Sequence, residues 1–140
     1  MTRRNTPEAD AQRAIVHALR FVLPHGAIVQ HSVNEVTSGD WRGKTRQAIL
    51  VGMGVHPGFA DLIVLSGGRV LFLEVKSKTG RLSPAQVAFR DTVQAQGFAW
   101  ALVRSVDDAL AALADHGFIT RVRRGHRAPS SASKSVRAVQ

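Results

Sequence analysis

The sequence predicts an α/β fold in which helices flank a mixed central sheet, with elements in the order αβββαβα. The first observation is a pair of apolar, β-branched runs joined by Gly67 and Gly68. This is the pattern of a tight hairpin, because both central residues of a type I′ turn need positive φ. The second observation is an apolar periodicity of helical spacing between Thr6 and Pro24. The third is the order helix, strand, helix after the hairpin, which implies a crossover onto the hairpin sheet.

The N-terminal segment carries the signals of a helix followed by a strand. Thr6 is a preferred N-cap residue, and Pro7 is a preferred first residue of a helix. Pro24 and Gly26 interrupt the periodic pattern, so the helix is expected to stop before them. The segment Ala-Ile-Val-Gln-His-Ser-Val at 27–33 then predicts the first strand.

The segment 37–47 is polar, contains glycine and carries three basic residues, which predicts a long basic loop. Long loops inside compact domains are usually functional or disordered. In the functional interpretation, Arg42, Lys44 and Arg46 contact DNA phosphates while Trp41 stacks on a base or a sugar. In the alternative, the loop is solvated and Trp41 packs back on the core. The sequence favours neither interpretation.

Helical signals return after the hairpin. Ser83, with Gln86 three residues later, forms a capping-box pattern. This helix is expected to end at Gly97. A further apolar strand follows at residues 98–103, and a last helix is closed by Gly117.

Residues 1–122 are therefore expected to form one domain. Residues 123–140 contain five basic residues and no acid, which predicts a disordered basic tail. The whole chain has a net charge of +9 and a pI near 11.6, typical of a protein that binds nucleic acid or an anionic membrane. No apolar run is long enough to span a bilayer. The N-terminus lacks the apolar core of a signal peptide, and the chain has no cysteine, so a cytoplasmic protein is expected.

The open end of the hairpin combines acidic and basic side chains. Counting outward from the Gly-Gly turn, Asp61 lies opposite Glu74, and Lys76 projects from the same face. Like charges placed opposite each other are destabilising, and burying them unpaired costs more. Two acids beside a lysine therefore predict a divalent-metal site of the kind that binds Mg²⁺. The alternative is that both acids are solvated strand-end charges, one of them paired with Lys76.

An Asp, a short hairpin and then Glu-Val-Lys resemble the PD-(D/E)xK nuclease signature. More narrowly, residues 54–86 are similar to the virus-type replication-repair nuclease (VRR-NUC) domain, mainly through the run Gly-Arg-Leu-Ser-Pro-Ala-Gln at 80–86. The resemblance extends from Glu8 to about Gly117. It departs at Ala60, where the family has a proline that shapes the backbone and binds no metal.

The resemblance implies a restriction-endonuclease-like core and a DNA nuclease that depends on Mg²⁺ or Mn²⁺. It implies that the metal ligands are Glu8, Asp61, Glu74 and the backbone carbonyl of Val75, and that the catalytic residues are Asp61, Glu74, Lys76 and Gln86. Two of these residues have simpler explanations from sequence alone. A first-turn Glu8 complements the helix dipole, and Gln86 completes a capping box.

DNA is the expected partner. Lys78 and Arg81 precede the helix that starts after Ser83, so a phosphate bound at that helix N-terminus would lie near them. The resemblance implies branched or flapped DNA as substrate, in phage or prokaryotic repair, replication or recombination, and it is compatible with a homodimer.

Two other functions compete with this interpretation. A Holliday-junction resolvase would share the same signature and would require a symmetric dimer. A basic DNA-binding accessory protein would bind DNA tightly and in a salt-sensitive way, without cleavage.

Overall fold

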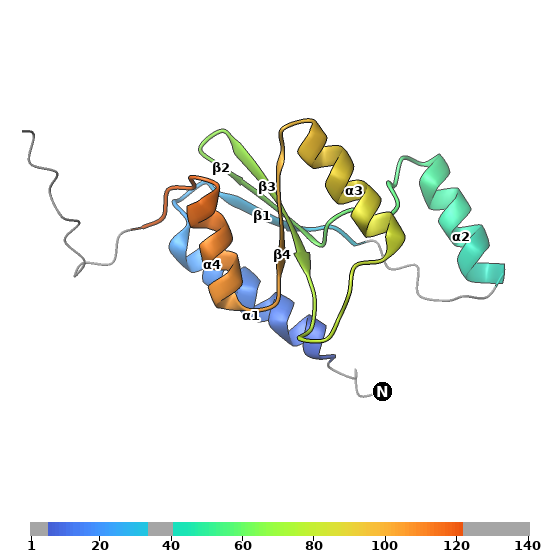
Figure 1. The fold of residues 1–140 in the computed structure, drawn as a ribbon, viewed down its shortest axis with the longest axis horizontal. Helices are drawn as coiled ribbons and strands as arrows, with labels where there is room; N and C mark the ends of the chain where they lie inside the picture. Colours follow the sequence, from blue (N-terminus) through green and yellow to red (C-terminus); the bar gives the residue numbers. More distant parts are fainter. Residues whose placement is uncertain (1–5, 34–40, 122–140) are drawn as a thin grey trace, which may run out of the picture.

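A computed structural model describes residues 6–33 and 41–121, with side chains for all of these except residues 41–43. Figure 1 shows the arrangement of the elements. They are α1 (Pro7–Val22), β1 (Ile28–His31), α2 (Trp41–Gly52), β2 (Leu62–Ser66), β3 (Arg69–Val75), α3 (Pro84–Ala95), β4 (Ala99–Val103) and α4 (Val106–Asp115). The predicted tail at 123–140 lies outside the described residues, and so does the first part of the predicted basic loop.

The four strands form one mixed sheet in the order β1-β2-β3-β4. The first two pairs are antiparallel, and β3 pairs with β4 in parallel. Gly67 and Gly68 have φ values of 58° and 76°, so the turn is the tight type that the sequence predicted. The hairpin register is also as predicted, with Ser66 opposite Arg69 and Ile63 opposite Phe72. The crossover through α3 makes the β3–β4 pair parallel.

Helices cover both faces of the sheet, and alternate residues of each strand supply the two cores. On one face Leu71, Leu73 and Val75 of β3 pack with α1 and α4. On the other face Phe72 packs with Phe89 of α3 in an aromatic cluster. Asp61 and Glu74 alternate with the first set of core residues, so they belong to the α3 face.

The region predicted as a basic loop at 37–47 contains most of a helix, so that prediction is wrong from Trp41 onward. The element order is αβαββαβα. The polar composition and the glycine of this segment favoured a loop. Residues 44–51, however, are largely good helix formers, and they form the helix. The helix ends where the amide of Val55 donates to the carbonyl of Leu50 and Gly54 takes a φ of 102°.

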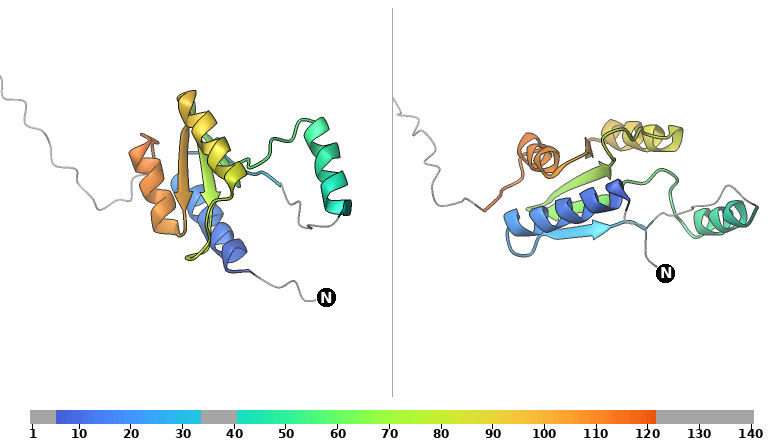
Figure 2. Two further views of the ribbon diagram at one scale, coloured as in Figure 1. Left: turned by 45° about the vertical axis from the view of Figure 1, so that its right-hand side comes forward. Right: turned by 90° about the horizontal axis from the view of Figure 1, so that it is seen from below.

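Figures 1 and 2 show α2 standing apart from the sheet and the other helices. Its apolar side chains are correspondingly exposed, with Ile49 at 58% and Val51 at 44% of full exposure. Met53, just beyond the helix, is 78% exposed. Among the described helices, none combines the length and apolar character needed to cross a membrane.

Candidate active site

The two hairpin acids lie where the strands of the hairpin end. Asp61 directly precedes β2, and Glu74 is the second-last residue of β3. The pairing of Leu62 with Leu73 places Asp61 opposite Glu74, as the sequence predicted. The Asp61 side chain also reaches across to the neighbouring residue, because its Oδ2 accepts a hydrogen bond of 2.8 Å from the amide of Val75. Backbone geometry therefore fixes one carboxylate against the strand that carries the other.

Glu74 is a buried acid, with only 1% of its surface exposed. One oxygen, Oε1, accepts a hydrogen bond of 2.8 Å from Gln86 Nε2 and lies 3.5 Å from the Lys76 ammonium. The other oxygen, Oε2, is buried without a hydrogen-bond partner among the described residues. Burial, reinforced by the Asp61 carboxyl and opposed by Lys76, raises the pKa of Glu74 to about 8. At pH 7 the metal-free protein therefore holds Glu74 mostly in its protonated form.

Gln86 joins α3 to the acid pair by using both ends of its amide. Its Oε1 accepts from the amide of Ser83 at 2.8 Å, and its own backbone amide donates to Ser83 Oγ at 3.2 Å. This is the full capping box that the sequence predicted. The Nε2 group remains available for Glu74. The capping role and the site role therefore coexist in one side chain.

Lys76 leaves β3 on the same face as Glu74. Its backbone amide donates to the carbonyl of Val103 at 3.0 Å, which continues the pairing of β3 with β4 by one residue. Its side chain is only 12% exposed, so the ammonium is held inside the site and does not extend into solvent.

A cleft of about 1020 Å³ opens beside the acid pair. Asp61, Gln86 and Glu8 line it together, so the first turn of α1 does face the predicted site. Asp10, the other acid of that turn, is exposed and pairs with Arg13 at 3.1 Å. Three other parts of the chain also line the cleft. They are the end of β1 (His31, Ser32), helix α2 (Gln47, Leu50, Val51) and the segment before β2 (Val55, His56, Phe59).

Two acids that line the cleft, with Glu74 beside them, do not yet make a metal cluster. Within residues 6–33 and 41–121, no group of three His, Cys, Asp or Glu side chains is close enough to hold a metal ion. The structure brings Asp61 and Glu74 together, and it places Glu8 across the cleft from them without contact.

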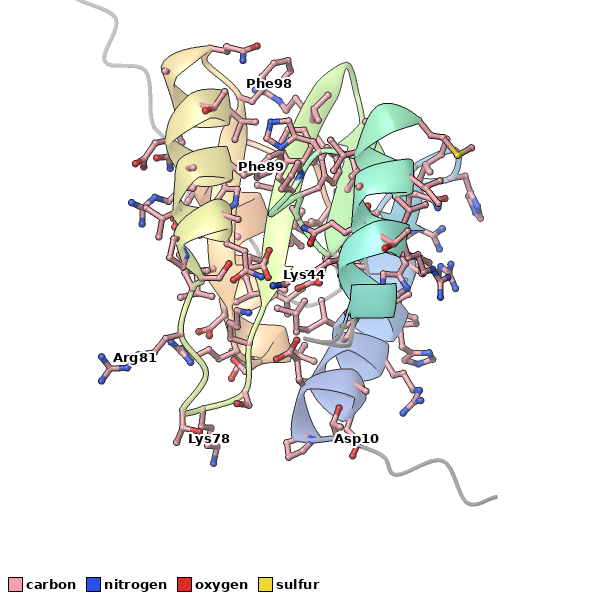
Figure 3. All side chains as sticks on the ribbon, turned by 90° about the vertical axis from the view of Figure 1, so that its right-hand side faces the viewer. Asp10, Lys44, Lys78, Arg81, Phe89 and Phe98 are labelled. Carbon is pink, nitrogen blue, oxygen red and sulfur yellow. The ribbon has the colours of Figure 1, made fainter. Side chains whose placement is uncertain are left out.

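Of the predicted DNA-binding residues, the four whose side chains are described lie outside the cleft lining. Lys44 and Arg46 are exposed on α2, and Figure 3 shows Lys44 pointing from α2 toward the side where α3 lies. Lys78 and Arg81 are exposed on the loop before α3, and in Figure 3 both point away from the body of the protein. The side chain of Arg42 is outside the described part of the chain.

The donors present suit a hard divalent cation. Asp61 and Glu74 supply carboxylate oxygens, and Glu74 Oε2 is a buried acceptor that lacks a described partner. The N–H and C=O of a strand residue point to the same edge, so the Val75 carbonyl faces the edge where its amide meets Asp61. Oxygen ligands of this kind are what Mg²⁺ and Mn²⁺ prefer. The residues therefore fit the metal that the sequence resemblance implied.

Sequence reasoning missed two contributors to this region. The first is the inner side of α2, which supplies Gln47 and Leu50 to the cleft wall. An Asp at position 40 and a glycine at position 54 are typical helix boundaries that could have revealed this helix. The second is Arg104, whose guanidinium donates to the carbonyls of Ser77 and Gly80. A lone arginine after a strand gives no sequence signal for such a contact.

Comparison with known proteins identifies the family and the fold. The sequence model of the VRR-NUC domain matches residues 27–107. A solved structure described as a VRR_NUC domain protein superposes with a TM-score of 0.61 at 18% identity, covering 81% of this chain and 89% of that chain. A second, described as a VRR_NUC domain, gives 0.52 at 21% identity and covers 81% and 100%. No curated protein matches the chain. The fold is therefore restriction-endonuclease-like, and Glu8 lies outside the matched residues.

Proposed function

The chain belongs to the VRR-NUC domain family, a nuclease family whose substrate is DNA, and we propose that it hydrolyses phosphodiester bonds with Mg²⁺ or Mn²⁺ bound at Asp61 and Glu74. The observation that carries the proposal is Glu74 Oε2, a buried carboxylate oxygen with no described partner beside a second carboxylate. Two carboxyls this close oppose each other's ionisation, so a divalent cation bound between them would complete the site.

The ligands of that cation would be Asp61, Glu74 and the Val75 carbonyl, with Glu8 contributing from α1 across the cleft. When bound, the cation supplies neutralisation of phosphate charge and lowers the pKa of a bound water. Lys76, held beside Glu74, stabilises negative charge at the scissile phosphate and orients the attacking water. Gln86 keeps Glu74 in place through Nε2, and its position on the cleft wall lets it contact the same water or phosphate.

We also infer how DNA is held. Phosphates on either side of the cleft would meet cations from α2 and from the loop before α3, namely Arg42, Lys44, Arg46, Lys78 and Arg81. Contacts of this kind read shape and not sequence, which favours branched or flapped DNA over a specific site. Such an enzyme would act inside a prokaryotic or phage-infected cell, in DNA repair, replication or recombination.

The test is cleavage of labelled single-stranded, duplex, flapped and four-way-junction DNA with Mg²⁺, Mn²⁺ or EDTA. Wild type is compared with Asp61→Asn, which keeps an oxygen for the Val75 amide and removes the charge. Metal-dependent cutting that is lost in Asp61→Asn supports the proposal, and the panel ranks the substrates.

Two outcomes would redirect the proposal. Binding without cutting, equal in both proteins, would leave a basic DNA-binding accessory protein. Symmetric cutting of the four-way junction alone, by a protein that sediments as a dimer, would indicate a Holliday-junction resolvase.

A further inference from the structure

Arg104 lies just after β4 and reaches back to the chain that follows β3. Its Nη1 donates to the carbonyl of Gly80 at 2.8 Å and also to the carbonyl of Ser77. The same Ser77 carbonyl accepts from the Gly80 amide at 3.2 Å, which closes a turn over residues 77–80. One guanidinium nitrogen therefore binds both ends of this turn.

The turn at 77–80 packs against the side chain of Lys76. A Cβ added at Gly80 would lie 3.4 Å from both Cβ and Cδ of Lys76 and 3.2 Å from Ser77 Oγ. The aliphatic part of Lys76 is thus covered by the turn, which agrees with its low exposure of 12%. A covered stem has few rotamers available, so the ammonium stays near Glu74 Oε1.

Arg104 is itself anchored to the helix that follows. Its backbone amide donates to Asp108 Oδ2 at 2.9 Å, and Ser105 caps the same helix by accepting from the amide of Asp108. Backbone pairing between β3 and β4 ends at the bond from Lys76 to Val103. Beyond that bond, the Arg104 side chain connects the end of β4 to the four residues 77–80 that follow β3 and Lys76.

We propose that Arg104 is a positioning residue that acts through Lys76. It holds the turn 77–80 against the lysine stem and so keeps the ammonium at the carboxylate pair. The inference rests on the proposed function for its effect on cleavage, because Lys76 matters to turnover only if the site hydrolyses DNA. Its structural part, the holding of Lys76, can be tested without turnover.

The first experiment measures lysine reactivity. Wild type and Arg104→Ala are treated with an amine-acetylating reagent, and the rate at each lysine is followed by mass spectrometry. Lys44 is exposed on α2, away from this turn, and serves as the internal standard. We expect the rate at Lys76 relative to Lys44 to rise several-fold in Arg104→Ala, because the turn no longer covers the stem of Lys76. An unchanged ratio would overturn the inference.

The second experiment is a double-mutant cycle on cleavage, with Lys76→Ala, Arg104→Ala and both together. We expect Arg104→Ala to lower kcat by about 10- to 100-fold with KM nearly unchanged, as for a small misplacement of a catalytic group. The double variant should be no slower than Lys76→Ala, because residues acting through one another are not additive. Additive losses would mean that Arg104 acts independently, and would overturn the inference.

One further variant separates positioning from charge, and a second, distant arginine variant is the control. Arg104→Lys keeps the charge but not the planar donor geometry, so we expect it to resemble Arg104→Ala. Wild-type kcat in Arg104→Lys would assign the effect to charge and contradict the proposal. Arg20→Ala removes an exposed arginine near the end of α1 and should leave kcat unchanged.

Failure of the proposed function would be visible separately. A wild-type protein that cuts no substrate with either metal would remove the nuclease proposal. The acetylation ratio would still decide whether Arg104 holds Lys76 in place.

Discussion

Two of the walls of the cleft, one formed by α2 and one by the start of α3, are built in different ways. The α3 wall is tied to the sheet by the aromatic core and by Gln86, which bonds to Glu74 of β3. The α2 wall stands away from the sheet, and Ile49 and Val51 remain exposed on it (Figures 1 and 2). We expect the groups that need placement to a fraction of an ångström to lie on the wall that is tied to the sheet, whereas the α2 wall carries cations that need only to approach a phosphate. Variants on each wall test this contrast.

The largest effect is expected from Glu74→Gln, which should separate activity from stability. Cleavage should fall by about three orders of magnitude or more, because the substitution removes a charged ligand of the cation that stabilises charge on the phosphate. Stability of the metal-free protein should rise at pH 8 by an amount on the order of a few kcal/mol. The reason is that the folded protein holds a proton on Glu74 up to a pKa of about 8, whereas the unfolded chain releases it near 4.5.

The sign of the pH dependence follows from this pKa. Between pH 4.5 and 8 the folded state binds more protons than the unfolded state, so wild-type stability is full at low pH and falls as pH rises through this window. Urea unfolding in EDTA across that range measures the slope, which Glu74→Gln should flatten. Asp10→Asn, at an exposed acid, is the matched control. A slope that survives in Glu74→Gln would place its cause elsewhere.

The second prediction compares one glycine on each wall. Gly58 and Gly54 both have positive φ, at 73° and 102°. A Cβ at Gly58 would lie 2.2 Å from the carbonyl oxygen of Ala85 in α3, whereas a Cβ at Gly54 meets nothing within 4 Å. Gly54→Ala should therefore cost about 1 kcal/mol from backbone strain alone, and Gly58→Ala about 2–4 kcal/mol because the clash adds to that strain.

Thermal or urea unfolding of the two alanine variants measures the difference. Gly58→Ala should also slow cleavage, because the displaced first turn of α3 carries Gln86. An equal loss of stability in the two variants would show that α3 moves aside to accommodate the added methyl group, and would contradict the contrast between the walls.

The third prediction separates the two ends of the Gln86 amide. Ser83→Ala removes one partner of the capping box and should cost about 1 kcal/mol of stability, with kcat nearly unchanged. Gln86→Ala removes the cap and also the hydrogen bond to Glu74, so we expect a similar loss of stability and about a tenfold or greater loss of kcat. Parallel effects on kcat in both variants would mean that the helix cap alone matters.

The contrast between the walls also explains what the sequence could predict. The hairpin register follows from local rules, because a two-residue Gly-Gly turn and a period of two leave one arrangement, and this places Asp61 opposite Glu74. The spacing of Ser83 and Gln86 likewise predicted the capping box that the structure contains. Helix α2 was not predicted, because its apolar residues 48–51 are consecutive and do not recur at helical spacing, which is the main sequence signal of a helix.

Long-range contacts escaped prediction for a different reason. The bond between Gln86 and Glu74 and the contacts of Arg104 with the turn at 77–80 join segments that only the fold brings together. No local pattern encodes them. The position of Glu8 across the cleft is similar, since spacing alone gave it a helix-dipole role and only the family resemblance pointed it to the site.

The smallest effects are expected from single cations on the α2 wall. Lys44→Ala and Arg46→Ala should each weaken DNA binding by a few-fold, and each should reduce the slope of log K against log salt by about one if a phosphate contact is lost. Cleavage at saturating DNA should be unchanged, because neither residue lines the cleft beside the acid pair. Fluorescence anisotropy over a salt series, run in EDTA, measures binding apart from turnover. Lys78→Ala and Arg81→Ala provide the same measurement on the α3 side. If the α2 variants lower kcat and leave the salt slope intact, α2 takes part in the chemistry, and the division of labour between the two walls is wrong.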